Sequence, residues 1–234
     1  MPSPARNPHS GRGRQAEARR NDLAVLDAAR DVFTAHGADA PISAVAERAG
    51  VGMGTLYRRY GSKTELLQYL CVLSLRQVID AAEAALAAAD PWDGLLGYVR
   101  ACVGFGAGAF APLAGTIEVT GEMLATAKRS DLLLRSVLAR AQASGQARPD
   151  VTGDDVWGII EQFSRPSANP RTSDESGIRQ RILAITLDGL RPQSDTCLRG
   201  TLPSPHATAR KWIDPRDQPA QAPHDRGEPS ALEI

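Results

Sequence analysis

A short segment of the chain combines residue types that bind phosphate. The segment from Ala49 to Lys63 reads AGVGMGTLYRRYGSK, with glycines at alternate positions followed by tyrosines, arginines and a lysine. Accessible backbone N–H groups and basic side chains are common phosphate ligands in proteins. The phosphate could belong to a nucleotide cofactor or to the backbone of a nucleic acid, and the elements around the segment must decide between these two.

Neither of the common nucleotide-binding loops matches this segment. A dinucleotide-binding fingerprint requires G-x-G-x-x-G directly after a strand. Counted from Gly50, the third glycine position falls on Thr55, and counted from Gly52 it falls on Tyr57, while the preceding residues have a helical pattern. A P-loop requires Gly-Lys-Ser/Thr, whereas the sequence here is GSKT. Both loops are therefore disfavoured.

A helix-turn-helix explains the glycines. We expect Gly50 to end a short helix in a left-handed conformation, and Gly52 to be the N-cap of the next helix. Gly54 would then let the start of that helix approach the backbone of another molecule. Ser43 is expected to cap the first helix of the pair, and Ser62 the helix that follows.

A helical wheel gives the helix expected over residues 52–60 two different faces. At about 100° per residue, Leu56 and Tyr60 point inward. The other side carries small or polar groups, with long polar groups at its edges: Gly54, Thr55 and Arg58, then Tyr57 and Arg59. A helix in the major groove needs this arrangement, because its centre faces the bases and its edges face phosphates. The alternative is that Tyr57 belongs to the core and the arginines are only solvated.

Composition and charge place this segment in a basic part of an otherwise acidic protein. The 234 residues are 42% apolar, 23% charged and 5% aromatic, which is typical of a globular protein. Residues 1–63 carry 10 Lys/Arg against 6 Asp/Glu, whereas residues 64–190 carry 11 against 15. Three scattered cysteines and the lack of a secretory signal indicate a reducing, cytoplasmic location. The histidines and acidic residues form no catalytic or metal-binding pattern, so we expect neither an enzyme nor a cofactor.

The periodicity of apolar residues predicts an all-α protein of about nine helices. The expected helices cover about residues 17–36, 43–50, 52–60, 62–89, 92–110, 112–127, 130–144, 154–164 and 174–190. The uncharged run 101–117 is shorter than the roughly 20 residues of a membrane span, so we expect a buried helix there and no membrane partner.

The predicted domains follow from the same pattern. We expect a flexible basic arm over 1–15, a helix-turn-helix domain over 16–63, a larger helical domain over 64–190, and a disordered, proline-rich tail over 191–234. The second half of the expected arm and the residues just after it contain four arginines. These side chains could enter the minor groove of DNA or could be merely solvated: Arg12, Arg14, Arg19 and Arg20.

The stretch from Leu26 to Leu67 resembles the DNA-binding domain of the tetracycline-repressor (TetR) family of bacterial regulators. The family signature is met by Ala49-Gly50-Val51, by Thr55-Leu56-Tyr57, and by Tyr60 and Lys63. The segment from about 139 to 156, ARAQASGQARPDVTGDDV, resembles the connection between the seventh and eighth helices of the family. Elsewhere the similarity is limited to the number and length of the helices.

The resemblance implies a homodimer that places two recognition helices in successive major grooves of double-stranded DNA, at a palindromic operator. It implies that the domain over 64–190 binds an effector and dimerises through its last two helices, and that binding of a small molecule to this domain releases the DNA. Among these residues, those expected to face DNA are Ser43, Met53, Gly54, Thr55, Tyr57, Arg58, Arg59 and Lys63. Met53 and Gly54 would lie nearest the bases, and Thr55, Tyr57, Arg59 and Lys63 would touch mostly phosphate.

Our hypothesis is therefore a dimeric, ligand-responsive repressor, bacterial, cytoplasmic and associated with the nucleoid. We expect an apolar or amphipathic effector between the helices of the central body, because large aromatic and thioether groups of the kind that line pockets lie between residues 90 and 165: Trp92, Tyr98, Phe105, Phe110, Met123, Trp157 and Phe163. We expect a dimer interface over about 154–190, where Ile178, Ile182, Ile185 and Leu190 form an apolar stripe. The alternative is an enzyme or small-molecule carrier in which the helix-turn-helix is only structural.

Overall fold

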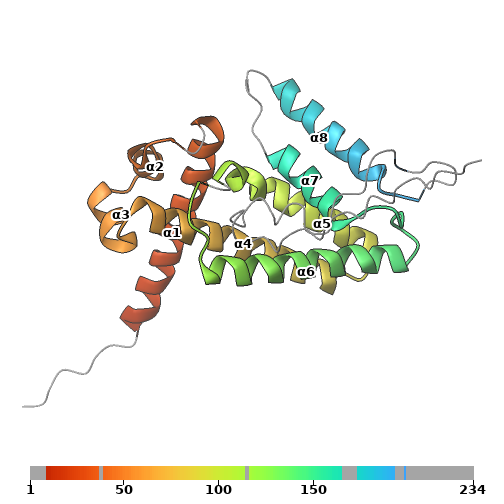
Figure 1. Cartoon of the computed structure of the whole chain (residues 1–234), viewed down its shortest axis with the longest axis horizontal. Coiled ribbons are helices and arrows are strands. Elements are labelled where there is room, and N and C mark those ends of the chain that lie inside the picture. Colours follow the sequence, from red (N-terminus) through yellow and green to blue (C-terminus); the bar gives the residue numbers. More distant parts are fainter. Residues whose placement is uncertain (1–8, 37–38, 114–115, 165–172, 193–197, 199–234) are drawn as a thin grey trace, which may run out of the picture.

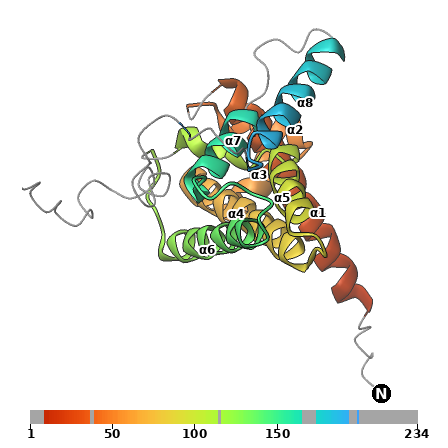
Figure 2. The same ribbon diagram turned by 90° about the vertical axis from the view of Figure 1, so that its right-hand side faces the viewer.

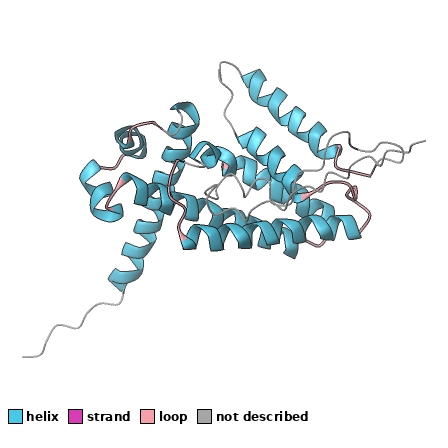
Figure 3. Ribbon diagram, in the orientation of Figure 1, coloured by secondary structure: helices cyan, strands magenta, loops and turns pink. Residues whose placement is uncertain are grey.

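A computed structural model describes residues 9–36, 39–113, 116–164, 173–192 and 198 of the chain (Figure 1). Within these ranges every regular element is helical, as the sequence predicts (Figure 3). Eight α-helices and one 3₁₀ segment follow one another: α1 (His9–His36), α2 (Ile42–Ala49), α3 (Met53–Tyr60), α4 (Lys63–Ala87), α5 (Pro91–Gly104), η1 (Ala107–Leu113), α6 (Gly121–Ala143), α7 (Gly153–Ser164) and α8 (Ser173–Asp188).

Helices α1, α2 and α3 gather around the first half of α4 at one end of the molecule (Figure 1). Their inward side chains form one buried apolar cluster, which includes Leu26 and Phe33 of α1, Val45 of α2 and Leu56 of α3. We call α1 to α3, together with α4 as far as Val72, the head. The rest of α4, with α5, η1, α6, α7 and α8, is the body.

The core of the head is completed by side chains of the body. Phe110 and Leu113 of η1 and Met123 of α6 are buried in the same cluster as the apolar residues of the head. A second cluster fills the body, where Val78 of α4, Leu95 of α5 and Ile160 of α7 are buried. Helix α4 contributes to both clusters and runs beside α6 in both views (Figures 1 and 2).

A buried arginine joins α1 to the body. The guanidinium of Arg30 donates hydrogen bonds to Ser74 Oγ at 2.9 Å and to Gln77 Oε1 at 2.8 Å, both on α4. Its Cζ lies 5.2 Å from the ring centre of Phe105, at the end of α5. Burial lowers the pKa of Arg30 to about 10, so the side chain is still charged at neutral pH.

The end of α4 is held by its two neighbours in the body. A Cβ at Gly94 of α5 would lie 2.5 Å from the carbonyl oxygen of Ala85, so a glycine is required for this close approach. Arg140 of α6 donates to four carbonyl oxygens at the end of α4 and just after it, those of Ala85, Leu86, Ala88 and Ala89. The carbonyl of Ala85 also accepts from the N–H of Ala88. The last carbonyls of a helix generally lack a partner from the next turn, and a cation also suits the negative end of a helix dipole.

Much of the uncharged run 101–117 is not α-helical, whereas we expected a buried helix there, with helices over 92–110 and 112–127. Helix α5 ends at Gly104, Gly106 has a left-handed φ of 68°, and residues 107–113 form a 3₁₀ segment. Several glycines and Pro112 in this run make a continuous α-helix unfavourable. A Cβ at Gly108 would lie 2.7 Å from Cα of Glu161, so the glycine at this position lets η1 pack closely on α7.

Helix α6 is continuous where we expected two helices with a break near residues 128–129. Lys128 and Arg129 are good helix formers and no glycine or proline lies beside them, so nothing interrupts the backbone there. The helix begins at Gly121, and Thr120 is its N-cap, with a side chain that accepts a hydrogen bond from the N–H of Met123.

The ends of the head helices agree only partly with the sequence. Gly50 adopts the left-handed conformation, Gly52 is the N-cap of α3, and Ser62 caps α4 by accepting from the N–H of Glu65. Ser43, in contrast, is not the N-cap of α2: Pro41 is, because a proline can precede the first helical residue without losing a hydrogen bond.

Helix α1 begins at His9, so residues 9–15 are helical where we expected a flexible arm. Residues 1–8 and most of the expected proline-rich tail lie outside the described residues, as does Gly37, the expected stop of α1.

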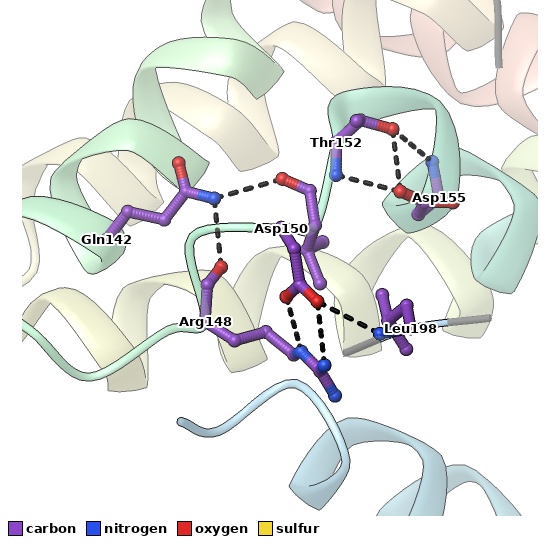
Figure 4. A network of polar contacts seen from close by, with 7 residues as sticks. Gln142, Arg148, Asp150, Thr152, Asp155 and Leu198 are labelled. Carbon is purple, nitrogen blue, oxygen red and sulfur yellow. Dashed lines mark hydrogen bonds and ion pairs between the residues drawn. The ribbon is translucent and has the colours of Figure 1, made fainter. Parts of the chain in front are cut away.

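Polar contacts fix the connection between α6 and α7 (Figure 4). Gln142 Nε2 donates to the carbonyl oxygens of Arg148 at 3.0 Å and Val151 at 2.9 Å. The guanidinium of Arg148 binds Asp150, whose Oδ2 also accepts from the N–H of Leu198 at 3.1 Å. The hydrogen bonds from Arg148 and from the backbone lower the pKa of Asp150 to about 2.

Helix α8 lies next to α7 at the outside of the body (Figures 1 and 2). Leu187 is buried against the body, whereas Ile178, Ile182 and Ile185 are 57%, 49% and 67% exposed. Leu190 is buried after the end of the helix, so it does not belong to the exposed stripe in which we had placed it. In the described part of the chain, no helix is both long and apolar enough to cross a membrane.

Candidate nucleic-acid interface

The turn between α2 and α3 has the geometry of a helix-turn-helix. Gly50 has φ 68° and ψ 27°, a left-handed backbone conformation that residues other than glycine rarely adopt. The N–H of Val51 bonds to the carbonyl of Ala46 at 3.0 Å, which closes the end of α2. The carbonyl of Gly52 accepts from the N–H groups of Thr55 and Leu56 and so starts α3.

The inner and outer faces of α3 are those that the helical wheel predicts. Leu56 and Tyr60 are buried in the head core. The remaining candidates on this helix are exposed to solvent apart from Met53: they are Gly54, Thr55, Tyr57, Arg58 and Arg59. Tyr57 is 46% exposed, which excludes the alternative that it is a core residue.

The residues on this face differ in how accessible they are to another molecule. Arg58 folds back along its own helix, and its Nε donates to the carbonyl of Gly54 at 3.1 Å. There is open space where a Cβ of Gly54 would lie, so this position permits close approach from outside. Met53 is half-buried and packs against the head core, so only part of it is available to a base.

The two candidates outside α3 flank it. Ser43 is exposed in the first turn of α2. Lys63 is half-buried at the first position of α4, and its Nζ donates to the carbonyl of Ala40 at 3.1 Å. An ammonium group has three donors, so this bond leaves donors of Lys63 available to another acceptor.

A buried carboxylate lies behind the exposed face. Asp22 of α1 is only 6% exposed and accepts three hydrogen bonds: from Arg59 at 2.6 Å, from the hydroxyl of Tyr60 at 2.7 Å and from the hydroxyl of Tyr69 at 2.8 Å. The Tyr60 and Tyr69 rings are 5.1 Å apart. Burial and the bond to Asp22 raise the pKa of both tyrosines, so both hydroxyls are protonated donors at neutral pH.

Sequence reasoning missed Asp22 and Tyr69, although α1 contains a signal. Asp22 shares a helical stripe with Leu26, Ala29 and Phe33, all of which are buried. A charged residue on the apolar stripe of a helix has to find a partner inside the protein, because an unpaired buried charge is very unfavourable. The sequence alone does not tell which distant residues supply that partner.

Comparison with known proteins supports the same assignment from two parts of the chain. Residues 25–70 match the model for bacterial regulatory proteins of the tetR family, and residues 90–192 match the C-terminal domain of SbtR-like transcriptional regulators. The chain belongs to the TetR family. The first match covers the second part of α1 from Val25 onward, all of α2 and α3, and α4 as far as Leu70, and the second match covers α5 to α8.

Individual TetR proteins resemble the chain over different lengths. The uncharacterized HTH-type transcriptional regulator TtgW of Pseudomonas putida is 41% identical over 63 residues, which are 26% of this chain and 46% of that protein. A TetR regulator from Mycobacterium vanbaalenii is 28% identical with a TM-score of 0.53, over 76% of this chain and 99% of its own. SCO0520 from Streptomyces coelicolor is 25% identical with a TM-score of 0.52, over 74% and 99%. The fold is also shared by LfrR from Mycobacterium smegmatis, whose structure contains proflavine, at 22% identity, a TM-score of 0.52, and 74% and 96% coverage.

Membership of the TetR family makes the chain a DNA-binding transcriptional regulator and not an enzyme. This agrees with our interpretation of the sequence and argues against an enzyme in which the helix-turn-helix is only structural. The described residues include no group of three or more His, Cys, Asp or Glu side chains placed to hold a metal ion.

Proposed function

We propose that the chain is a dimeric repressor that binds a near-palindromic operator and leaves it when a small apolar or amphipathic effector binds. We assign DNA binding to residues 16–63 and dimerisation and effector binding to residues 64–190, and we infer a cytoplasmic location beside the bacterial nucleoid. The observation that carries the proposal is the exposed face of α3, where a glycine and small polar groups are flanked by long polar side chains.

The expected roles follow from position on this face. Thr55 and Arg58 face outward at the centre of α3, where a helix in the major groove meets the base edges. Tyr57 at one edge and Lys63 at the start of α4 would meet phosphates, with Ser43 at the start of α2 beside them. Gly54 and Met53 offer no bidentate contact to a base, so DNA shape would supply part of the specificity.

A homodimer is supported by the surface of α8. Ile178, Ile182 and Ile185 recur at intervals of four and three residues, so they share one helix face, and about half or more of each side chain is exposed. Adjacent exposed isoleucines are typical of a surface that a partner covers. A second copy of the chain is the partner that matches a palindromic site, since a two-fold symmetric protein reads both half-sites alike.

An amphipathic effector is supported by the interior of the body. Large apolar groups such as Trp92 and Tyr98 are buried there. The hydroxyl of Tyr98 is buried beside the thiol of Cys102, which is only a weak hydrogen-bond partner. An apolar effector that carries a hydrogen-bond acceptor would give this hydroxyl a stronger partner on binding.

The test begins with DNA selected by the protein itself from a random duplex pool. We expect a symmetric sequence with half-sites separated by about one helical turn or a multiple of it. A reporter gene placed behind this sequence should be silenced by the chain. Failure to enrich any sequence, with folded protein, would contradict operator binding.

Titrations at several salt concentrations test the phosphate contacts. The Lys63→Ala variant should weaken binding to operator and scrambled duplex alike and lower the salt slope by about one, because one phosphate contact is lost. Lys128→Ala is the matched control, since Lys128 is an exposed lysine on α6 of the body. Unchanged affinity and slope for both Lys63→Ala and Tyr57→Ala would show that this face does not meet DNA.

The effector is tested with a panel of apolar and amphipathic compounds that includes proflavine. At least one should raise the melting temperature of the protein and weaken its binding to the operator. Tyr98→Phe should reduce that response while DNA binding without compound stays unchanged. If no compound alters melting or DNA binding, control by such a ligand is wrong.

A further inference from the structure

The recognition helix has few apolar side chains with which to fix its own orientation. Helix α3 has only eight residues, of which Leu56 and Tyr60 are buried. Isolated helices of this length are unstable in water, so contacts with neighbouring elements determine where α3 lies. Apolar contacts are not directional, so two buried side chains define the rotation of the helix about its own axis less exactly than hydrogen bonds do.

Asp22 supplies the contacts that would limit this rotation. Arg59 and Tyr60 are consecutive residues of α3, so their side chains leave the helix about 100° apart, yet both donate to the carboxylate of Asp22. The hydroxyl of Tyr69 on α4 donates to the same carboxylate. One buried carboxylate therefore joins α1, α3 and α4.

The position of Arg59 bears on its expected role. We expected this side chain to contact phosphate, but its guanidinium lies 2.6 Å from Asp22 and its side chain is 38% exposed. Its Cζ also lies 5.6 Å from the ring centre of Tyr60. A bond to a buried carboxylate is stronger than one to a solvated group, because the surrounding medium screens it less.

We propose that Asp22 is a positioning residue for DNA recognition, which fixes the rotation of α3 through Arg59 and Tyr60, and that Arg59 acts through Asp22 rather than as a phosphate contact. The inference rests on the proposed binding to an operator. If it is correct, loss of Asp22 moves the base-reading side chains out of register, whereas contacts to phosphate, which need less exact placement, are kept.

The main test compares Asp22→Asn with a matched control on the same helix. Asp31 of α1 forms an ion pair with Arg48 of α2 at 2.6 Å, but both side chains are more than half exposed. Asp22→Asn and Asp31→Asn each remove one negative charge from the head, so their general effect on attraction to DNA is similar. Asparagine also keeps the shape of the side chain.

Binding is measured with the full chain, at a temperature where circular dichroism shows each variant to be folded. We expect Asp22→Asn to weaken operator binding about tenfold or more, with little change in binding to scrambled duplex and no change in salt slope. Asp31→Asn should bind the operator within about twofold of the unmodified chain. Operator binding by folded Asp22→Asn equal to that of Asp31→Asn would overturn the proposal.

The role of Arg59 is tested by Arg59→Ala and by the double variant with Asp22→Asn. We expect Arg59→Ala to lose discrimination between operator and scrambled duplex without a change in salt slope, and the double variant to be no worse than the more damaging single one. A fall in salt slope of about one for Arg59→Ala would show a phosphate contact and overturn this part of the proposal.

Tyr69→Phe keeps the test decisive if Asp22→Asn does not fold. This change removes only the hydroxyl on α4, and it should cause a smaller loss of the same kind, confined to operator binding. Unchanged discrimination by folded Tyr69→Phe would then count as refutation. Failure of the proposed operator binding can be told apart from failure of the inference about Asp22. In the first case the unmodified chain itself would show no preference for any selected duplex.

Discussion

Thr55 and Arg58 lie one helical turn apart on the outward face of α3, and both are exposed. We expect Thr55→Ala and Arg58→Ala to cost on the order of 1–3 kcal/mol at particular base pairs and to relax the preference there. The measurement is a titration of each variant against a set of operators that differ at single base pairs. An equal loss at every base pair would show that the residue meets phosphate instead.

A control for these variants comes from the body. Arg129 on α6 is exposed and forms an ion pair with Glu83 at 2.5 Å. Arg129→Ala removes a charge of the same kind as Arg58→Ala but lies outside the head, so the base-pair preferences should stay the same. A change of preference in this variant would mean that general charge, rather than position on α3, controls the result.

The faces of α3 could be predicted from the sequence because they depend on helical geometry alone. The inward placement of Leu56 and Tyr60 and the exposure of Tyr57 follow from about 100° per residue. The partners of a long side chain do not follow in this way. Arg59 can reach several acceptors, and its bond to Asp22 depends on how α1 packs against α3, which local periodicity does not specify.

At the scale of elements, Arg140 replaces the usual glycine at the end of a helix. The C-cap of α4 is Ala88, and the carbonyls near it accept from Arg140 instead of from a left-handed glycine turn. We expect Arg140→Ala to lower the free energy of unfolding by about 1.5–3 kcal/mol, as is usual for hydrogen bonds to a charged group. Urea unfolding at neutral pH measures this change.

Arg140→Lys is the informative companion to this variant. Lysine keeps the charge near the end of α4 but lacks the planar group that reaches several carbonyls at once, so an intermediate loss is expected. Arg129→Ala should change the stability by less than about 1 kcal/mol, because its ion pair is exposed. If Arg140→Ala were as stable as Arg129→Ala, the bonds to α4 would not stabilise the fold.

The helix boundaries show where local signals succeed. Caps with a physical requirement were predicted correctly, as for Gly50 with its positive φ and Ser62 with its side-chain acceptor. The region between α5 and α6 was predicted poorly, because apolar residues there continue the helical periodicity through glycines that stop the helix. Close packing of Gly108 on α7, a contact between segments far apart in sequence, favours the 3₁₀ segment over a longer helix.

At the scale of the whole molecule, the exposed face of α8 predicts the oligomeric state. Ile182→Glu or Ile185→Glu should give monomers in light scattering, since a charge in an apolar interface is strongly unfavourable. Leu132→Glu on α6 is the matched control, because Leu132 is 65% exposed, as Ile185 is at 67%. A folded dimer in both isoleucine variants would place the interface elsewhere, and a monomer in the Leu132 variant would place it on α6.

The packing of Phe110, Leu113 and Met123 into the head core limits what can be transplanted between regulators. A hybrid that takes residues 1–63 from this chain would leave behind Leu66, Leu67 and Leu70 of α4 as well as these three side chains, and its hydrophobic centre would be open on one side. The exchangeable unit is therefore larger than the binding motif. To move the specificity alone, an engineer would graft the outward residues of α3 and keep every buried side chain of the recipient.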